Sequence, residues 1–136
     1  CRSITITSRT FAKAADLAHK FQGAAIDFTD FRGQLDAFDI LISATDADGF
    51  VLQSSDIEGS QARRRGRPIF LIDLAMPRDI DQRAALLENV FLYNLDDLSD
   101  IANENLLKRK KGVDGCRESL AARAYRLWEG MRTDSP

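Results

Sequence analysis

Charged side chains cluster directly after a short apolar run near the middle of the chain. The run spans residues 69–72 and ends at Asp73, which is typical of a strand buried on both faces in a parallel sheet. Pro77, Arg78 and Asp79 follow within a few residues. Ligands of open α/β sheets bind beyond the carboxyl ends of the strands. The cluster therefore marks a candidate binding edge, and the alternative is a plain strand followed by a proline-stiffened loop.

A second polar turn, Ser8-Arg9-Thr10, follows an alternating β-branched stretch at residues 3–7, which favours a strand. If this is the second strand of a dinucleotide fold, its end meets the adenine ribose, where an acid binds NAD and an arginine suits the 2′-phosphate of NADP. A guanidinium can form two hydrogen bonds to phosphate oxygens, and Lys13 lies one helical turn further on. We therefore expect NADPH as the cofactor; the alternative is an ordinary surface arginine.

A third turn, Ser43-Ala44-Thr45, ends the apolar run at residues 38–43. Its small residues would let a nicotinamide ribose approach the backbone. We expect no catalytic residue and no metal ligand in this chain. The residues expected to bind the cofactor are Ser8, Arg9, Thr10, Lys13, Ser43, Ala44, Thr45, Asp73, Ala75 and Pro77.

The glycine-rich phosphate turn of a dinucleotide fold, G-x-G-x-x-G, is missing from the sequence. Gly23, Gly33 and Gly49 do not have its spacing. The chain also begins with Cys1 rather than Met, and a strand is under way three residues later. We therefore expect a piece of a longer protein, whose first strand and phosphate loop precede Cys1.

Strand and helix patterns alternate through residue 94, which predicts an α/β fold with a Rossmann-like, doubly wound parallel sheet that lacks its first strand and glycine-rich loop. Residues 1–95 are the expected partial NADP-binding domain, and residues 96–136 the expected dimerisation helix region. The strands are expected at residues 3–7, 24–28, 38–43, 69–72 and 90–93; helices at 11–21, 54–62 and 81–87; and a short helix or loop at 29–37.

The helix expected at residues 11–21 has a capping residue at each end. Thr10 is the N-cap candidate and Gly23 the C-terminal candidate. The apolar face of this helix is expected to point inward, with Phe11, Ala14 or Ala15, Leu17, Ala18 and Phe21.

The helix expected at residues 54–62 is followed by an arginine run at residues 63–65, where cations interact favourably with the helix dipole.

The last forty residues indicate one long helix with a single apolar stripe, which needs a partner helix to bury it. Gly112 and Gly115 interrupt the pattern, and the sequence leaves open whether the helix is continuous or broken there. The basic run at residues 108–111 is interpreted as a solvated face, with a tRNA contact as the minority interpretation. The stripe consists of Leu98, Ile101, Ala102, Leu106, Val113, Cys116, Leu120, Ala124, Leu127, Trp128 and Met131.

The composition is that of a globular protein, with 44% hydrophobic and 29% charged residues among 136. A net charge of −2 indicates neither DNA nor membrane binding, and no apolar run approaches the roughly 20 residues that span a bilayer. Cys1 and Cys116 lie far apart, which fits free thiols in a reducing cytoplasm. His19, the single histidine, cannot build a metal site alone.

The segment from Ile72 to Asp81 reads Ile-Asp-Leu-Ala-Met-Pro-Arg-Asp-Ile-Asp, and it closely resembles a segment of glutamyl-tRNA reductases. The resemblance covers most of the chain. It also includes the Ser8 and Ser43 turns, residues 63–68, residues 91–98, and Asn103-Glu104-Asn105-Leu106 at the start of a helix that resembles the family's dimerisation helix.

The resemblance implies the NADPH-binding part of an enzyme that reduces glutamyl-tRNA to glutamate-1-semialdehyde for tetrapyrrole (porphyrin and heme) synthesis. It implies a homodimer with glutamyl-tRNA as partner. The catalytic cysteine of that family lies in a separate N-terminal domain that nothing here matches, so this chain by itself is expected to be inactive. Two alternatives are an NADP domain of a shikimate-dehydrogenase-like oxidoreductase and a non-catalytic dimerising module of the same fold.

Overall fold

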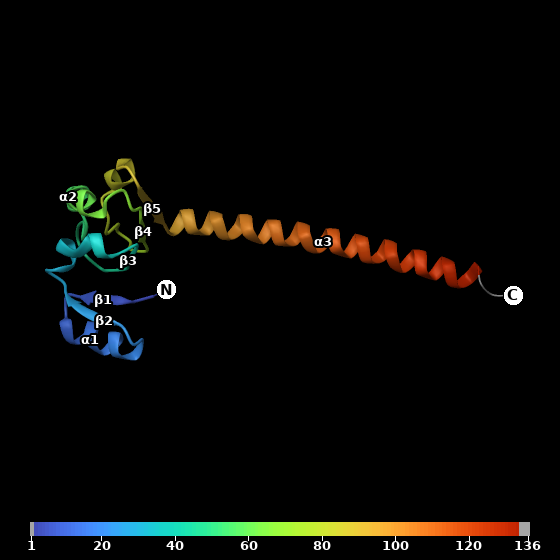
Figure 1. Cartoon of the computed structure of the whole chain (residues 1–136), viewed down its shortest axis with the longest axis horizontal. Helices are drawn as coiled ribbons and strands as arrows, with labels where there is room; N and C mark the ends of the chain where they lie inside the picture. Colours follow the sequence, from blue (N-terminus) through green and yellow to red (C-terminus); the bar gives the residue numbers. More distant parts are fainter. Residues whose placement is uncertain (1, 134–136) are drawn as a thin grey trace. The chain divides into compact units, whose positions relative to one another are not determined.

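The computed structural model describes residues 2–133, except for the side chains of residues 111, 112, 114, 116 and 126–133. The chain divides into two compact units, Cys1–Asn94 and Leu95–Pro136 (Figure 1). The first unit alternates strands with helical segments, as the sequence predicts. Its elements are β1 (Thr5–Ser8), α1 (Phe11–Lys20), β2 (Ala24–Asp27), η1 (Phe31–Ala37), β3 (Ile40–Ser43), α2 (Ser54–Arg64), β4 (Ile69–Asp73), η2 (Gln82–Leu86) and β5 (Val90–Asn94).

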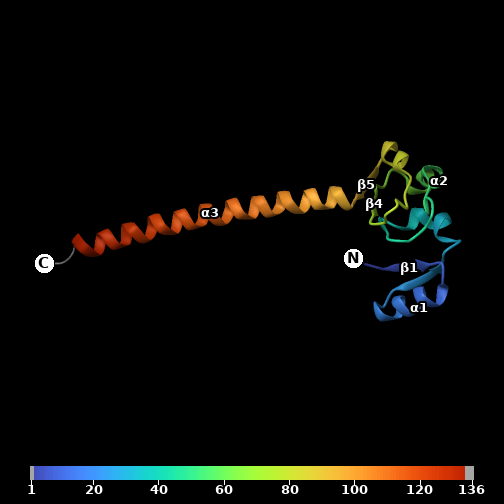
Figure 2. The same ribbon diagram turned by 180° about the vertical axis from the view of Figure 1, so that it is seen from behind.

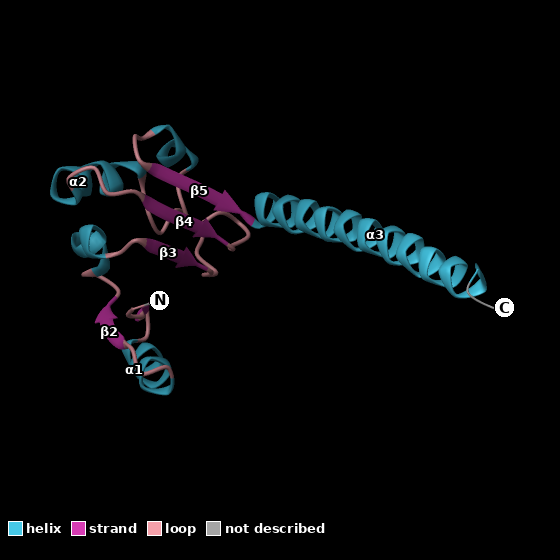
Figure 3. Ribbon diagram, turned by 45° about the vertical axis from the view of Figure 1, so that its right-hand side comes forward, coloured by secondary structure: helices cyan, strands magenta, loops and turns pink. Residues whose placement is uncertain are grey.

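The strands form two parallel sheets in the described residues, one of β1 and β2 and one in the order β3-β4-β5. Figure 3 shows the strands of the second sheet side by side. Strands β1 and β3 each end a sheet, so each has one edge without a neighbouring strand in this part of the chain. Parallel strands place their carboxyl ends together, and the polar turns that follow β3 and β4 therefore meet at one edge.

Among the described residues of the first unit, helical segments cover one face of the sheet of β3, β4 and β5. Ile69 and Leu71 of β4 are buried in the core with residues of η1, α2 and η2. On the other face, Phe70 is 38% exposed and stacks on Phe91 with ring centroids 5.0 Å apart. The prediction of a strand buried on both faces is therefore wrong, because α2, η1 and η2 all pack against the same side.

Helix α1 ends in a Schellman arrangement. Gly23 donates its N–H to the carbonyl of Ala18 at 2.8 Å, and Gln22 donates to His19 at 3.2 Å. The left-handed residue is Gln22, with φ of 53°, rather than the predicted Gly23. Glycine is needed for a different reason, because a Cβ at this position would lie 2.5 Å from the carbonyl oxygen of Ile4.

The inward face of α1 is narrower than its periodicity predicts. Ala14 and Ala18 are buried, whereas Phe11, Leu17 and Phe21 are each 44–54% exposed. The helix packs on a sheet of only two strands, and that sheet covers its small residues but not its large ones. The 3.6-residue pattern therefore identifies the helix correctly but overestimates how much of it is buried.

Arg64 holds the amino-terminal side of the β3-β4-β5 sheet together. Its side chain is 2% exposed, and Nε donates to the carbonyl of Arg67 at 3.1 Å. Nη1 donates to the carbonyls of Leu35 at 2.7 Å and Phe38 at 2.6 Å, while Nη2 donates to that of Pro68. One buried cation thus ties the end of α2 to the end of η1 and the start of β4. The predicted arginine run therefore has a structural role beyond the helix dipole.

The second unit contains α3, a single α-helix from Leu95 to Thr133 (Figure 2). It continues through Gly112 and Gly115, so of the two alternatives that the sequence leaves open, the continuous helix is the one observed. Exposed apolar side chains recur every seven residues, with Leu106 64%, Val113 57% and Leu120 67% exposed. The side chains of Cys116, Leu127, Trp128 and Met131 lie outside the described part. Within residues 2–133, no helix is both long and apolar enough to cross a membrane.

We predict that Arg64→Met destabilises the first unit by about 3 kcal/mol, because buried carbonyl oxygens would lose their donor. Arg65→Met is the control, since Arg65 is exposed at the same helix end and a surface change should stay within about 0.5 kcal/mol. Urea unfolding measures both. Equal effects of the two changes would contradict the structural role of the buried guanidinium.

Candidate functional site

The candidate site lies at the carboxyl ends of the strands, where β3 and β4 are in register. Ser43, the last residue of β3, is the register partner of Asp73, the last residue of β4. The N–H of Leu74 donates to the carbonyl of Ser43 at 2.8 Å. The pairing therefore continues one step past the strands, and it fixes where the segment after β4 begins relative to β3.

Asp79 joins the segment after β4 to the turn after β3. Its side chain is fully buried. One carboxylate oxygen accepts the hydroxyl of Ser43 at 2.6 Å and the N–H of Thr45 at 2.8 Å. The other accepts the hydroxyl of Thr45 at 2.6 Å. Three donors from one turn thus converge on a single carboxylate that lies 34–36 residues away in sequence.

Asp73 shapes the segment after β4 from within. Its buried carboxylate accepts the backbone N–H groups of Ala75 at 3.1 Å, Asp79 at 3.1 Å and Ile80 at 3.0 Å. A buried carboxylate is costly unless donors surround it, and here the backbone supplies them. The chain between Asp73 and Ile80 is therefore folded around this carboxylate.

Asp81 links two helical segments next to this edge. It is the N-cap of η2, accepting the N–H of Arg83 at 3.0 Å, and it also accepts the hydroxyl of Ser54 at the start of α2 at 3.0 Å. The Arg83 guanidinium lies 2.8 Å from the same carboxylate. The hydrogen bond from the Arg83 side chain is the largest cause that lowers the pKa of Asp81, and the bond from the Arg83 N–H is the next. Together they hold this pKa well below its usual range.

Arg9 lies at the carboxyl end of β1, where its guanidinium is exposed. Nη2 donates to the carbonyl of Asp46, one residue after Thr45, at 3.5 Å. Thr10 is the N-cap of α1, as predicted, but its side chain makes no capping bond; instead its N–H donates to the hydroxyl of Ser8 at 3.3 Å. The turns after β1 and β3 therefore approach each other, with a cation between them.

The predicted cofactor residues fall into an exposed and a buried group. Arg9, Thr10, Lys13, Ala44 and Pro77 are exposed, and Ser8 and Thr45 are partly buried. Ser43, Asp73 and Ala75 are buried, and the polar atoms of the first two bond within the protein. The exposed group can reach a ligand directly, whereas the buried group determines the shape of the edge.

The sequence places Asp79 in the polar cluster after β4 without predicting a role for it in the site, and it predicts Asp81 only as the start of a helix. A signal for Asp79 does exist, because Ser43 and Thr45 offer hydroxyl donors at the end of the neighbouring strand. Recognising that signal requires knowing that the two strands are neighbours.

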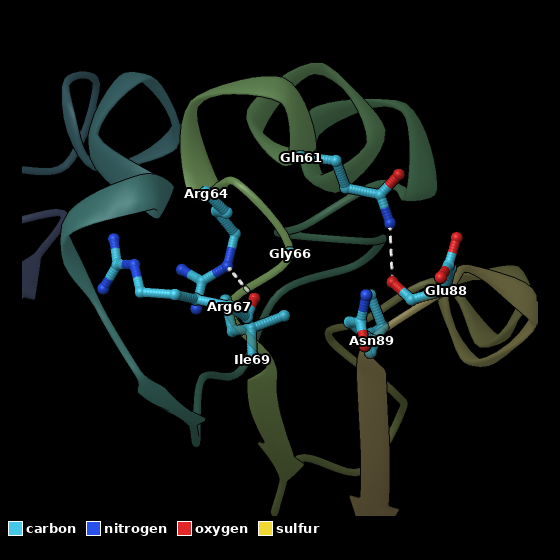
Figure 4. Close-up of a pocket in the computed structure, with 8 residues that line it drawn as sticks. Gln61, Arg64, Gly66, Arg67, Ile69, Glu88 and Asn89 are labelled. Carbon is cyan, nitrogen blue, oxygen red and sulfur yellow. Dashed lines mark hydrogen bonds between the residues drawn. The ribbon is translucent and has the colours of Figure 1, made fainter.

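A pocket of about 210 Å³ lies at the opposite, amino-terminal end of β4 and β5 (Figure 4). Arg64 in its wall is bonded to carbonyl oxygens, and the Gln61 side chain donates to the carbonyl of Glu88 at 2.8 Å. The Arg64 and Gln61 side chains are thus already bonded within the protein, so we do not assign this pocket the cofactor. Among the described residues, no group of three or more His, Cys, Asp or Glu side chains could hold a metal ion.

Residues 1–101 match a family model described as shikimate / quinate 5-dehydrogenase. The chain belongs to this family. The match covers the whole first unit and ends shortly after α3 begins. Family membership therefore rests on the two sheets and their helices rather than on most of the long helix.

Curated relatives of the chain are glutamyl-tRNA reductases. The protein of that name from Priestia megaterium is 40% identical over 131 residues, which is 95% of this chain and 29% of the relative. The one from Geotalea daltonii is 43% identical over 110 residues, or 81% of this chain and 25% of the relative. The predicted resemblance is confirmed, and the chain spans less than a third of the length of these relatives.

Solved structures confirm the fold. The glutamyl-tRNA reductase from Methanopyrus kandleri superposes with a TM-score of 0.76 at 34% identity, covering 82% of this chain and 28% of that one. The nucleotide-binding domain of the Thermoplasma volcanium enzyme gives 0.60 at 19% identity, covering 79% and 68%. The predicted Rossmann-like α/β fold is thus confirmed, and it is the fold of a nucleotide-binding domain.

We predict that Asp81→Asn lowers the unfolding temperature at neutral pH and that the difference from wild type shrinks in acid. The folded-state pKa of Asp81 lies below that of an unfolded aspartate, about 3.9. The stabilisation is therefore complete above about pH 5 and is lost as the pH falls through the unfolded-state pKa toward the folded-state pKa. Thermal unfolding from neutral to strongly acidic pH measures it, with the exposed Asp48→Asn as control. A difference that stays constant with pH would exclude the carboxylate charge as its source.

Proposed function

We propose that this chain is the NADPH-binding part of a glutamyl-tRNA reductase. The observation that supports it best is the reach of the similarity, since the relative from Priestia megaterium matches 95% of the chain, including most of α3. The family model, in contrast, stops at residue 101. The complete enzyme would reduce glutamyl-tRNA to glutamate-1-semialdehyde, for tetrapyrrole, and hence porphyrin and heme, synthesis.

The proposed cofactor site runs along the carboxyl edge. Arg9 carries the charge that suits the 2′-phosphate of NADPH, and Ser8, Thr10 and Lys13 surround the same turn. On the β3 and β4 side, Ala44 and Pro77 offer an exposed, uncharged surface to the nicotinamide half. When bound, NADPH supplies the hydride; the protein residues bind and orient it.

A further strand outside this chain would complete the site. Both β1 and β3 have an open edge in the described part of the chain. A parallel strand between them would pair with the backbone groups of both edges and bring a glycine-rich turn to the cofactor phosphates. Without it, this chain alone is expected to bind NADPH weakly or not at all and to reduce no glutamyl-tRNA.

The remaining parts of the proposal concern organisation and partners. Residues 1–95 form the partial NADP-binding domain, and residues 96–136 form the dimerisation region of a homodimer. The seven-residue spacing of the exposed apolar side chains on α3 supports a helix-helix contact. The partner of the complete enzyme would be glutamyl-tRNA, and neither DNA nor a membrane would take part. The enzyme would be located in the cytoplasm.

The family name favours one alternative, an oxidoreductase that acts on shikimate or quinate. A third possibility is a dimerising module without activity. Assays of the complete protein distinguish all three. The proposal expects NADPH oxidation that depends on glutamyl-tRNA and releases the semialdehyde. NADP reduction that depends on shikimate would overturn it in favour of the alternative, and turnover of neither substrate would favour the module.

We predict that Arg9→Ala weakens NADPH binding by the complete enzyme about ten- to a hundredfold, because one charge-assisted contact is lost. NADH, which has no 2′-phosphate, should change little. Arg9→Asp should go further, by adding repulsion toward NADPH and a possible partner for the NADH ribose hydroxyl. The measurement is kcat/KM for both cofactors, with Lys20→Ala at the far end of α1 as control. Equal losses for both cofactors would give Arg9 a structural role.

We predict that Leu120→Asp turns the proposed dimer into monomers without unfolding the sheets, because it places a charge in the apolar stripe of α3. Ala122→Asp adds the same charge about 200° further round the helix and should leave the dimer intact. Light scattering measures the mass, and circular dichroism monitors the fold. If both variants remain dimers, α3 packs on its own chain instead.

A further inference from the structure

We propose that Asp79 is a positioning residue for the nicotinamide half of the cofactor. Its buried carboxylate fastens the turn after β3 to the segment after β4, so that the two segments act as one rigid wall. This inference rests on the proposed function and adds a second role along the edge. Arg9 binds the 2′-phosphate at one end, and Asp79 fixes the backbone that contacts the nicotinamide half at the other end.

The fold separates the two halves of the candidate site. In a doubly wound sheet, a dinucleotide lies across the carboxyl edge, with one nucleotide on each half of the fold. Arg9 follows β1, which belongs to the first half. The nicotinamide half then lies over the ends of β3 and β4, where Ser43 and Asp73 are register partners.

Asp79 is the point where three segments meet at that end. Its carboxylate receives the donors of Ser43 and Thr45, as described above. Its own N–H donates to the Asp73 carboxylate at 3.1 Å. Its carbonyl accepts the N–H groups of Val51 at 2.6 Å and Leu52 at 3.0 Å. The side chain and both backbone groups are thus bonded, each to a different part of the chain.

Burial separates this residue from the ligand. Asp79 is completely buried, so it cannot touch a cofactor in this conformation. The residues beside it in the two segments are accessible, since Ala44 and Pro77 are exposed and Met76 is 76% exposed. The carboxylate acts through these neighbours, by fixing the backbone that carries them.

Asp81 provides a matched comparison only two residues away. It is also buried and also accepts hydroxyl and N–H donors. Its partners are Ser54 and Arg83, at the starts of α2 and η2, rather than the turn after β3. Loss of Asp81 should therefore lower stability without a selective effect on the nicotinamide half.

The key variants are Asp79→Ala and Asp79→Asn. Alanine removes the acceptors of all three donors. Asparagine can keep the geometry, because its carbonyl oxygen can accept the Ser43 hydroxyl and the Thr45 N–H while its amide donates to the Thr45 hydroxyl. A positioning role predicts loss in the first variant and recovery in the second.

The experiment measures binding of three probes to the complete enzyme by titration calorimetry: NADPH, adenosine 2′,5′-bisphosphate and reduced nicotinamide mononucleotide. Asp79→Ala should weaken NADPH and the mononucleotide about tenfold or more and leave the bisphosphate within about threefold. The rate of hydride transfer at saturating NADPH should fall about ten- to a hundredfold, because misplacement by a fraction of an ångström to 1 Å has effects of this size. Asp79→Asn should stay near wild type, and Asp81→Ala should lower the unfolding temperature but keep all three affinities.

Equal weakening of both half-cofactors by Asp79→Ala, or no weakening of either, would overturn the inference while leaving the proposed function intact. Wild-type enzyme that binds none of the three probes would overturn the proposed function itself. If Asp79→Ala does not fold, Ser43→Ala is the milder variant, because it removes one buried bond to the same carboxylate. It should then weaken the mononucleotide selectively, and an unchanged affinity would count against the positioning role.

Discussion

Buried carboxylates that accept hydrogen bonds hold the carboxyl edge of the β3-β4-β5 sheet together. A carboxylate without water is costly unless donors surround it, and this cost is met locally. Asp73 gathers three backbone N–H groups of the segment that follows it, and Asp79 gathers the donors of the neighbouring turn. Asp79 joins two segments that the strands only bring near one another, and Asp73 folds one of these segments around itself, so the shape of the candidate site depends on both side chains.

At the amino-terminal end of the same sheet, backbone acceptors rather than carboxylates need hydrogen-bond donors. There the unpaired backbone groups include carbonyl oxygens at the ends of α2 and η1, and Arg64 supplies the donors. A buried cation at one end and buried anions at the other give the sheet two rigid rims. Arg64 is bonded to the backbone at a packed rim, whereas Arg9, at the carboxyl edge, is exposed. This difference is why a ligand is expected at the carboxyl edge rather than in the pocket beside Arg64.

The family model and the curated relatives carry the names of two different enzymes. The family model carries the name of a shikimate or quinate dehydrogenase, whereas the curated relatives are glutamyl-tRNA reductases. One nucleotide-binding architecture can serve several chemistries, because substrate recognition depends on the residues of a particular site. In relatives more than three times as long as the matched region, those residues can lie in other parts of the protein. The long helix α3 is the part of this chain that extends beyond the family model.

Local patterns in the sequence determined most of the secondary structure and predicted a candidate site at the carboxyl edge. Apolar runs predicted the strands, and Thr10 predicted the start of α1, because strand and helix periods and caps depend only on neighbouring residues. Burial could not be predicted in the same way. Phe70 and Phe11 belong to correctly predicted elements but remain exposed, since burial depends on which elements cover a face. The partners of Asp79 and Arg64 lie up to 36 residues away in sequence, so only the tertiary structure decided that these two charged side chains hold the ends of the sheet.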